Sequence, residues 1–237
     1  MVGSILSCKG LTKKFGSVKA LNNLEFNLPA NGLFCLLGLN GAGKTTLIKC
    51  LLGLIKPSSG EIYFKGKPLK PQDVQNHFSY LPESFQLYRE LTAMELLRIL
   101  SLGLGKRSVK TLDALDLVGL SDKADRKIKT YSRGMIQRLG LAVCLIKKPQ
   151  IVFLDDPFLG LDIIGQIAMI EVIKKLKNQD QTVLFSSHIL SQVEKIADSV
   201  GIIDKGRMLF SGSTREFLSK QTASSLEAAF LKEVTSK

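Results

Sequence analysis

The stretch LFCLLGLNGAGKTTLIKCLLGL, residues 33–54, decides the fold. Its centre, residues 38–45, matches G-x-x-x-x-G-K-[ST], the pattern of a phosphate-binding loop. The apolar run at residues 33–37 predicts a buried strand that enters the loop, and the apolar spacing over residues 46–52 predicts a helix that leaves it. The alternative is a Gly-rich turn that happens to precede a helix, and the order of strand, loop and helix disfavours it.

The backbone of this loop explains its chemistry. Its three glycines permit turns and close approaches that a Cβ would block, so that successive N–H groups can point at an anion at the mouth of a helix. Lys44 can reach the β- and γ-phosphates of a nucleotide, and the Thr45 hydroxyl can ligate Mg²⁺. We therefore expect the protein to bind a nucleoside triphosphate with Mg²⁺. The residues expected to surround the phosphates are Gly38, Leu39, Asn40, Gly41, Ala42, Gly43, Lys44, Thr45 and Thr46.

The composition is typical of a folded protein without membrane spans. The 237 residues suffice for one large domain or two small ones, and 45% of them are hydrophobic and 23% charged. The longest apolar run, residues 139–146, falls well short of the ~18 residues of a membrane helix, and the first ten residues lack a secretory-signal pattern. The four cysteines are scattered without a C-x-x-C pair. They predict buried free thiols in a reducing compartment, which indicates a cytoplasmic protein.

The net charge of +12 has three interpretations: nucleic acid, an anionic membrane surface, or solubility alone. The densest basic group, Lys123, Arg126, Lys127 and Lys129, is short, and a solvated face is the favoured interpretation there. Proximity to the anionic cytoplasmic leaflet stays open. Nucleic acid is the weakest of the three, so no nucleic-acid partner is expected.

Two strands, residues 5–11 and 20–28, are predicted ahead of the phosphate loop, with a turn between them that contains Phe15. The Phe15 ring either stacks on an adenine or fills a local core, and the residues alone leave both roles open. Further strands are predicted at residues 61–64 and 78–81.

From residue 82 to about residue 148 the pattern becomes helical, with apolar spacing over residues 91–100, 109–118 and 135–146. Thr92 and Glu95 form a capping-box pattern ahead of the first helix, and Ser132 is placed to cap the last one. This segment predicts a helical subdomain inserted into an α/β core.

The core resumes with the short apolar strand IVFL, residues 151–154, which ends in Asp155 and Asp156. A carboxylate in this place is the second half of a P-loop ATPase site: Asp155 can hold Mg²⁺, and Asp156 can polarise the attacking water. His188 follows the strand predicted at residues 182–185, where an α/β sheet gathers its ligands. His77 has no such context, and we expect a structural role for it.

Taken in order, these motifs resemble those of the ATP-binding subunit of an ABC transporter, and the resemblance covers nearly the whole chain. It rests on YLPE at residues 80–83 as the Q-loop, YSRGM at 131–135 as the signature, IVFLDDP at 151–157 as the Walker B strand, GLD at 160–162 as the D-loop and the Ser187-His188 pair as the switch histidine. Phe15 falls where the family stacks an aromatic ring on adenine, which favours that role.

The resemblance implies a fold: a P-loop ATPase core of the α/β class, with a mixed sheet flanked by helices, an antiparallel β region and an inserted α-helical subdomain. It implies that residues 1–237 form a single ATP-binding domain. Within it, residues 1–82 and 149–220 form the core, residues 83–148 the helical signature subdomain, and residues 221–237 a helical tail.

The resemblance also implies a function. Family members hydrolyse ATP, with Mg²⁺, as head-to-tail dimers in which Ser132, Arg133 and Gly134 would face the γ-phosphate held by the partner, and the D-loop Asp162 would lie nearby. Asp156, His188 and Glu83 are the implied catalytic residues, and Thr45, Asp155 and Glu83 the implied magnesium ligands. The partners would be a second ATP-binding subunit, identical or related, and a separate membrane-spanning subunit docked around residues 83–94. Such a protein lies at the cytoplasmic face of the membrane without a span of its own.

Several residues depart from the family pattern. Glu83 replaces Gln, Arg133 and Met135 replace Gly and Gln of the signature, and Ile163 replaces a common Pro. The variant YSRGM is similar to that of exporter-type subunits of ABC-2 systems. Asp156 stands where the family has its catalytic Glu, one methylene longer. The shorter Asp156 side chain would place its carboxylate about 1 Å too far from the attacking water, and a displacement of that size can lower the rate ~100-fold. We therefore expect slow hydrolysis.

Two alternatives come from other functional classes. One is a soluble ABC-type ATPase that acts on ribosomes or nucleic acid, which the charge of +12 mildly favours. The other is a regulatory module that binds ATP with little turnover, which only Asp156 suggests.

Overall fold

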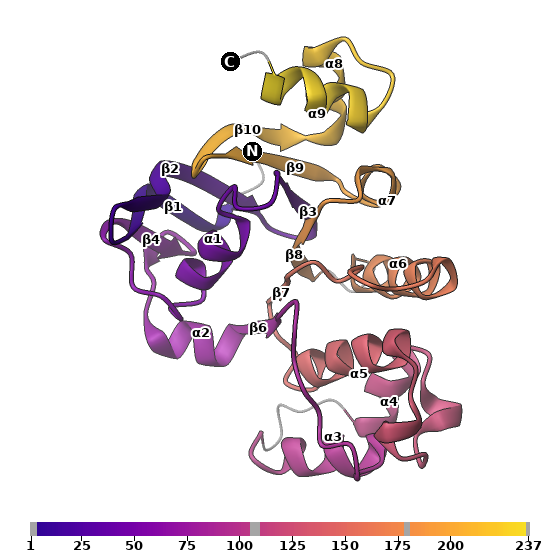
Figure 1. The fold of residues 1–237 in the computed structure, drawn as a ribbon. Helices are drawn as coiled ribbons and strands as arrows, with labels where there is room; N and C mark the ends of the chain where they lie inside the picture. Colours follow the sequence, from indigo (N-terminus) through magenta and orange to yellow (C-terminus); the bar gives the residue numbers. More distant parts are fainter. Residues whose placement is uncertain (1–3, 105–109, 178–180, 236–237) are drawn as a thin grey trace.

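A β-rich core carries a separate lobe of helices and a pair of helices near the end of the chain (Figure 1). The computed structural model describes residues 4–104, 110–177 and 181–235. Its strands are β1 (Ser4–Phe15), β2 (Val18–Pro29), β3 (Gly32–Leu37), β4 (Ser59–Phe64), β5 (Lys67–Pro68), β6 (Phe78–Leu81), β7 (Ile151–Leu154), β8 (Thr182–Ser187), β9 (Ser199–Asp204) and β10 (Arg207–Ser213). Its helices are α1 (Lys44–Leu51), α2 (Pro71–His77), α3 (Ala93–Leu102), α4 (Thr111–Leu117), α5 (Arg133–Leu145), α6 (Ile163–Lys177), α7 (Leu190–Glu194), α8 (Thr214–Gln221) and α9 (Leu226–Thr235), with the short 3₁₀ helices η2 (Ser121–Lys123) and η3 (Ile128–Thr130).

The strands form two sheets. The smaller sheet, in the order β2-β1-β4-β5, is antiparallel. The larger sheet has the order β10-β9-β3-β8-β7-β6, in which β10 pairs antiparallel with β9 and all other neighbours are parallel. A mixed sheet flanked by helices, with an antiparallel β region beside it, is the architecture predicted from the sequence, and that prediction is confirmed.

Strand β3 shows why the apolar run before the phosphate loop becomes a central strand. It pairs with β8 on one side and β9 on the other. Leu33, Cys35 and Leu37 belong to one hydrophobic cluster, and Phe34 and Leu36 belong to another. Because both faces of the strand are buried, every side chain along it must be apolar.

The hairpin β1–β2 corrects one prediction. Phe15 does not lie in a turn between two short strands: β1 extends to Phe15, which pairs with Val18. Gly16, with φ of +57°, supplies the left-handed backbone that a tight two-residue hairpin needs. Register shifts of the kind that β-bulges produce interrupt the ladder between β1 and β2 at four points.

The helical lobe agrees with the sequence in its caps. Thr92 Oγ1 accepts a 3.1 Å hydrogen bond from the Glu95 N–H, and the Glu95 carboxylate accepts one of 2.8 Å from the Thr92 N–H. Ser132 Oγ accepts a 3.3 Å bond from the Met135 N–H at the start of α5. Of the helix predicted at residues 109–118, α4 is present; Val109 lies outside the described residues.

Two short helices, α2 and α7, were not predicted. Helix α2 has no buried residue, so it shows no apolar face, and α7 has only five residues, too few for a helical period to stand out. At the end of α2, the His77 ring stacks on Phe64 with a centroid distance of 5.4 Å, which agrees with its expected structural role.

The cysteines and the basic group at residues 123–129 lie where the sequence analysis predicts. All four cysteines are buried free thiols, as predicted. In the basic group, Lys127 and Lys129 form exposed ion pairs with Glu90, at 3.5 and 3.0 Å, as a solvated face would. Within the described ranges, no helix is both long and apolar enough to cross a bilayer.

Candidate functional site

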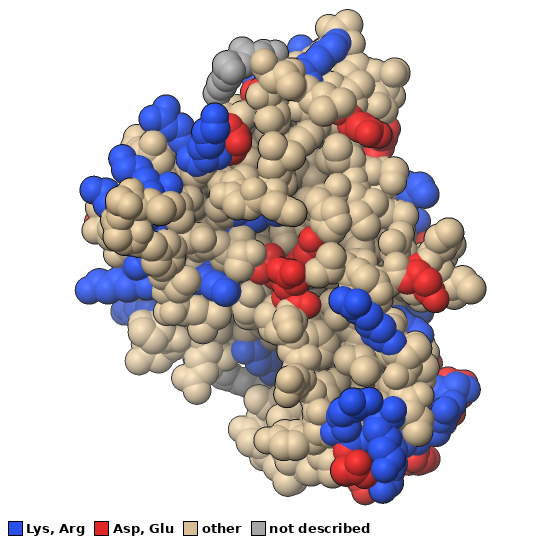
Figure 2. Space-filling view, in the orientation of Figure 1, with Lys and Arg blue, Asp and Glu red and all other residues tan. Residues whose placement is uncertain are grey.

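The predicted site residues meet at one edge of the larger sheet. Parallel strands β6, β7, β8 and β3 all end there, because neighbouring parallel strands share their carboxyl edge. Figure 2 shows acidic side chains gathered in the middle of this face. A hollow of about 340 Å³ opens at the edge, and its lining includes Asn40, Gly41, Gly43, Lys44, Thr45, Thr46, Glu83, Asp155, Asp156 and His188.

The phosphate loop is fixed from behind and open in front. A Cβ on Gly38 would overlap the carbonyl oxygen of Ile203, and one on Gly43, whose φ is +114°, would lie 2.7 Å from the carbonyl oxygen of Ala20. At Gly41, by contrast, a Cβ would meet nothing within 4 Å. The loop therefore requires glycine where it packs against β2 and β9, and it leaves free space on the side of the hollow.

Lys44 lies back across the loop. Its Nζ donates to the carbonyl oxygens of Gly38 at 2.8 Å and Leu39 at 3.1 Å. Burial lowers the pKa of Lys44 from its ordinary value, and the carboxylates of Asp156 and Asp155 oppose that shift. A phosphate would accept stronger hydrogen bonds from this ammonium than the two neutral carbonyl oxygens do, because both partners would then be charged.

Asp155 is the most enclosed carboxylate of the site, with 3% of its surface exposed. Its Oδ1 accepts hydrogen bonds from Thr45 Oγ1 at 3.1 Å and Ser186 Oγ at 2.7 Å. Its Oδ2 accepts one of 3.3 Å from the Tyr80 hydroxyl, whose pKa is raised by burial and by Asp155 itself. The sequence did not single out Tyr80 and Ser186, although both lie within or beside the quoted motifs YLPE and Ser187-His188.

Asp156 and His188 form a second pair, with Oδ2 and Nδ1 2.7 Å apart. Asp156 has a left-handed backbone, with φ of +48°, and its N–H donates to Ser186 Oγ at 2.8 Å. Burial raises the pKa of Asp156, and the hydrogen bond from His188 opposes the rise. The other oxygen, Oδ1, is buried and has no hydrogen-bond partner among the described atoms, so it is available to a water or a ligand.

This donor set fits Mg²⁺ held together with a nucleotide. No group of three or more His, Cys, Asp or Glu side chains in the described ranges is placed to hold a metal by itself. Mg²⁺ is usually bound through one or two carboxylates, with substrate phosphates and waters completing its octahedron. Thr45, Asp155 and Glu83 line the same hollow and provide oxygen ligands of the right kind.

Other predicted residues lie away from the hollow. Phe15 is 48% exposed at the end of β1, with Lys13 Nζ 4.9 Å from its ring centroid. Ser132, Arg133 and Gly134 lie at the start of α5, and Asp162 caps α6 through a 2.7 Å hydrogen bond from the Gly165 N–H. None of these is among the described residues that line the hollow. A single chain therefore brings together the loop and the carboxylates but not the signature.

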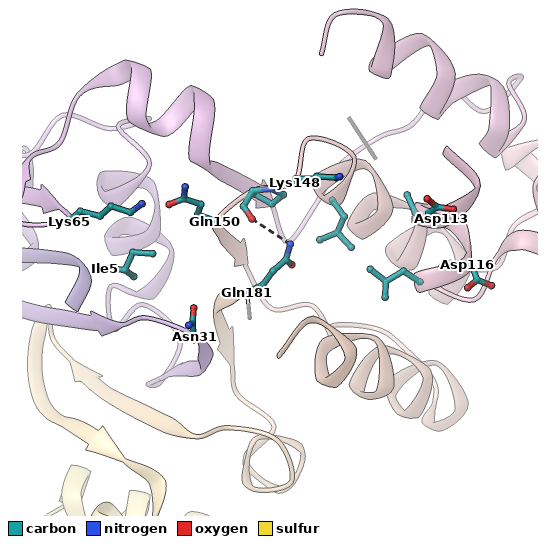
Figure 3. A pocket seen from close by; sticks show the side chains of 12 residues that line it. Ile5, Asn31, Lys65, Asp113, Asp116, Lys148, Gln150 and Gln181 are labelled. Atoms are coloured by element: carbon teal, nitrogen blue, oxygen red, sulfur yellow. Dashed lines mark hydrogen bonds between the residues drawn. The ribbon is translucent and has the colours of Figure 1, made fainter. Parts of the chain in front are cut away.

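A larger hollow, about 840 Å³, lies at the opposite edge of the sheet (Figure 3). It is lined by Asn31, Gln150 and Gln181, which come just before β3, β7 and β8, and by Asp113 and Asp116 of α4. The Gln181 side chain donates to the Pro149 carbonyl at 3.5 Å there. The predicted site residues are absent from its described lining.

Sequence comparisons agree with this geometry. A family profile described as ABC transporter matches residues 21–159. The lantibiotic transport ATP-binding protein SrtF of Streptococcus pyogenes is 38% identical over 205 residues, which are 86% of this chain and 89% of the relative. An ABC transporter ATP-binding protein of Synechocystis is 42% identical over 207 residues, 85% of this chain. The chain spans only 58% of the length of that relative and 63% of a similar one from Nostoc.

Solved structures lead to the same assignment. A solved ATP-binding subunit of an ABC transporter has a TM-score of 0.84 and 28% identity, covering 98% of this chain and all of its own. A cassette of an ABC transporter solved in its ADP conformation has a TM-score of 0.81 at 22% identity, covering 92% of this chain and 94% of its own, and is similar in fold alone. With a phosphate loop, a paired carboxylate and a matched profile over more than half of its length, the chain belongs to the ABC transporter family of ATP-binding proteins.

Proposed function

We propose that the protein is an ATP-binding and ATP-hydrolysing subunit that powers transport across a membrane. The observation that carries the proposal is the hydrogen bond between Thr45 and Asp155, because it joins the phosphate loop to the carboxylate that would share a magnesium ion with it. Relatives named for lantibiotic transport in Streptococcus pyogenes and bacitracin transport in Bacillus licheniformis support a role in transport.

Each side chain at the site has a role in this proposal. Lys44 would bind the β- and γ-phosphates, and Thr45, Asp155 and Glu83 would hold Mg²⁺, which neutralises phosphate charge when bound. Asp156 accepts a hydrogen bond from the attacking water through its unpartnered Oδ1, and His188 keeps the other oxygen of that carboxylate occupied. Because Asp is one methylene shorter than Glu, we propose that turnover is slow.

We further propose that the working unit is a dimer, of two copies or of one copy and a related subunit. The loop and carboxylates of one chain would be completed by the N-terminus of α5 of the partner, through the Ser132 hydroxyl and the backbone at Arg133 and Gly134. Backbone N–H groups at a helix N-terminus suit a phosphate. The location of these residues outside the hollow of their own chain supports this arrangement. Phe15 would stack on the adenine, and Asp162 would lie at the shared interface.

The membrane partner would be a separate membrane-spanning subunit, with this protein at the cytoplasmic face. We place its docking site around residues 83–94, where the Tyr88 side chain is 75% exposed. The signature YSRGM favours export. In this proposal residues 1–237 form a single ATP-binding domain, with the core at 1–82 and 149–220, the signature lobe at 83–148 and the tail at 221–237.

An ATPase assay on the purified protein with and without Mg²⁺ tests the enzymatic part. We expect Mg²⁺-dependent phosphate release, and light scattering of an Asp156→Asn variant should show a dimer with ATP and a monomer without it. ATP binding without measurable turnover in the wild-type protein would instead favour a regulatory ATP-binding module.

Copurification from detergent-solubilised membranes tests the transport part. We expect the tagged protein to retain a membrane-spanning subunit there, and phosphate release to change when that subunit is present. A salt-sensitive mobility shift with RNA, with no membrane subunit retained, would favour the soluble ATPase instead.

A further inference from the structure

Helix α5, which begins in the signature YSRGM, contacts the loop after β7 through Arg133, a residue that replaces a glycine of the family pattern. Arg133 is the first residue of α5, and Gly160 lies in the loop that joins β7 to α6. A Cβ on Gly160 would overlap the Arg133 guanidinium, which therefore lies directly against this glycine. Gly160 has φ of +65°, so its backbone conformation favours glycine. The guanidinium of the exposed Arg133 occupies the space that a side chain at position 160 would take.

A second close approach lies beside the first. A Cβ on Gly134 would be 3.6 Å from Gly165 Cα, and one on Gly165 would be 3.9 Å from Gly134 Cα, so the first turns of α5 and α6 meet nearly backbone to backbone. The Gly165 N–H also donates to Asp162 Oδ1 at 2.7 Å. The loop is thus joined to α6 by the Asp162 cap, and the Arg133 guanidinium lies against it two residues earlier, at Gly160.

The same loop carries two residues of the nucleotide hollow. Leu159, next to Gly160, lines the hollow together with Asp156. The Leu159 N–H donates to the Asp156 carbonyl oxygen at 3.1 Å, and the Leu161 N–H donates to the Phe158 carbonyl oxygen at 3.2 Å. The two turns span residues 156–159 and 158–161 and overlap at Phe158 and Leu159. We therefore expect a shift of Gly160 to move Leu159 and, through it, the backbone of Asp156.

We propose that Arg133 is a positioning residue that acts within its own chain: its guanidinium holds Gly160, and with it the loop that carries Asp156. The glycine that the family has at this point of the signature cannot make this contact. Arg133 forms none of the ion pairs found among the described residues, so the packing against Gly160 is its main observed interaction. The proposal rests on the proposed function for its catalytic consequence and on the geometry alone for its structural one.

The competing role for Arg133 is a cation supplied to the phosphates of the partner's nucleotide. The observed contact favours the role within the chain, because the guanidinium is already engaged with Gly160. The two roles differ in what lysine can replace. A lysine keeps the charge but not the planar guanidinium. Arg133→Lys should therefore retain a contact with phosphate, which Arg133→Ala loses, but it should lose the packing on Gly160.

Kinetics of single variants give the first test. We expect Arg133→Ala to lower kcat on the order of tenfold, with KM for ATP within about twofold, because misplacement of a catalytic group costs rate rather than uniform binding. Arg133→Lys should behave like Arg133→Ala. The matched control is Arg98→Ala, an exposed arginine on α3 of the same lobe, which should keep wild-type kinetics. Full activity in Arg133→Ala, or rescue by lysine, would overturn the proposal.

Mixed dimers separate the two roles directly. When Arg133→Ala chains are mixed with Asp156→Asn chains, one site of each mixed dimer has an intact Asp156 and a partner with an intact Arg133. If Arg133 acts within its own chain, the loop of that site stays unsupported and mixing gives no gain in turnover. A recovery of activity toward the wild-type rate per site would assign Arg133 to the partner's phosphates.

Hydrogen exchange without nucleotide tests the contact independently of catalysis. We expect amides of residues 158–162 to exchange faster in Arg133→Ala than in wild type and in Arg98→Ala, with those of residues 38–46 unchanged. Unchanged exchange at 158–162 would refute the positioning role. If exchange increases as expected but the wild-type protein hydrolyses no ATP with Mg²⁺, the contact stands and the proposed function fails.

Discussion

Thr45 Oγ1 donates a 3.1 Å hydrogen bond to Asp155 Oδ1, although the two residues are 110 positions apart in the chain. The bond ties the first turn of α1 to the end of β7, across the end of β8 that lies between β3 and β7. Ser186, at the end of β8, donates to the same oxygen at 2.7 Å. The start of α1 and the ends of β7 and β8 are thus joined at one carboxylate.

We predict that Thr45→Ala separates nucleotide binding from turnover. Loss of the hydroxyl would remove a proposed magnesium ligand and should lower kcat on the order of 100-fold, since metal-assisted charge stabilisation is worth several kcal/mol. Titration of activity with Mg²⁺ checks this, and the half-saturating concentration should rise. Thr45→Ser keeps the hydroxyl and serves as the control. Wild-type magnesium dependence in Thr45→Ala would remove Thr45 from the metal site.

The length of the side chain at position 156 is the next test. Asp156→Asn should lower turnover at least 100-fold, because an amide cannot act as the base, while ATP binding is retained. Asp156→Glu should raise kcat, because the added methylene brings the carboxylate closer to the water. Steady-state ATPase rates of the three proteins decide the matter. If Glu gives no increase, the missing methylene does not limit the rate.

Glycine at position 38 is predicted to be a requirement of packing. A Cβ there would overlap the backbone oxygen of Ile203, so Gly38→Ala should lower the free energy of unfolding by about 1–3 kcal/mol, as overpacking does. Urea denaturation measures the change. Gly103→Ala is the control: a Cβ there meets nothing within 4 Å, the backbone is right-handed, and the expected effect is within about 0.5 kcal/mol. Equal stability of both variants would contradict the close packing at Gly38.

The buried thiols should make the protein less stable at high pH. Burial raises the pKa of Cys8 and of Cys144 from 9.0 to about 12. Above pH 9.0 the unfolded chain loses these protons while the folded chain keeps them, so the free energy of unfolding falls as pH rises from 9.0 toward 12. Urea midpoints measured between pH 8 and 10 check the slope, and Cys144→Ala should reduce it. A slope unchanged in that variant would mean that Cys144 is not the source.

Alkylation gives a second readout of the same burial. At pH 8 the native thiols should react with iodoacetamide at least 100-fold more slowly than those of the denatured chain, because the thiolate is the reactive form. Mass spectrometry should find up to four labels only after denaturation. Fast labelling of Cys8 in the native protein would contradict its burial.

Phe15 is predicted to contribute to nucleotide affinity rather than to the core. Stacking of a base on an aromatic ring is worth about 1–3 kcal/mol, so Phe15→Ala should raise KM for ATP by about tenfold or more with little loss of stability, because the ring is 48% exposed. Val18→Ala, at the residue paired with it, is the matched control. An unchanged KM would exclude adenine stacking by Phe15.

The sequence predicted those parts of the fold that repeat a local pattern. The strand before the phosphate loop, the helix after it and the caps at Thr92 and Ser132 are each specified by residues within a few positions of one another. Helix α2 was missed because none of its residues is buried and it therefore has no apolar face, and α7 because five residues do not establish a period. The end of β1 at Phe15 was missed because a hairpin is set by pairing with a second strand, which no local pattern shows.

The site divides in the same way. The motifs led to the prediction that Lys44, Thr45, Asp155 and Asp156 share a site, and the structure brings these four residues to one hollow. The hydrogen bonds of Tyr80 and Ser186 to Asp155 were not predicted, since they depend on the order of strands in the sheet. The contact of Arg133 with Gly160 also joins two distant segments, and only the three-dimensional structure reveals it.

Strand β3 has a consequence for how the protein unfolds. Its alternate side chains belong to two separate hydrophobic clusters, so β3 lies between the two halves of the hydrophobic core and packs against both. The phosphate loop begins at Gly38, directly after the end of β3. If either half unfolds, β3 and the phosphate loop lose their packing together. Nucleotide binding should therefore depend on the cooperative unfolding of the whole domain and not on local fraying. Nucleotide affinity should therefore persist up to the main thermal transition and disappear within it.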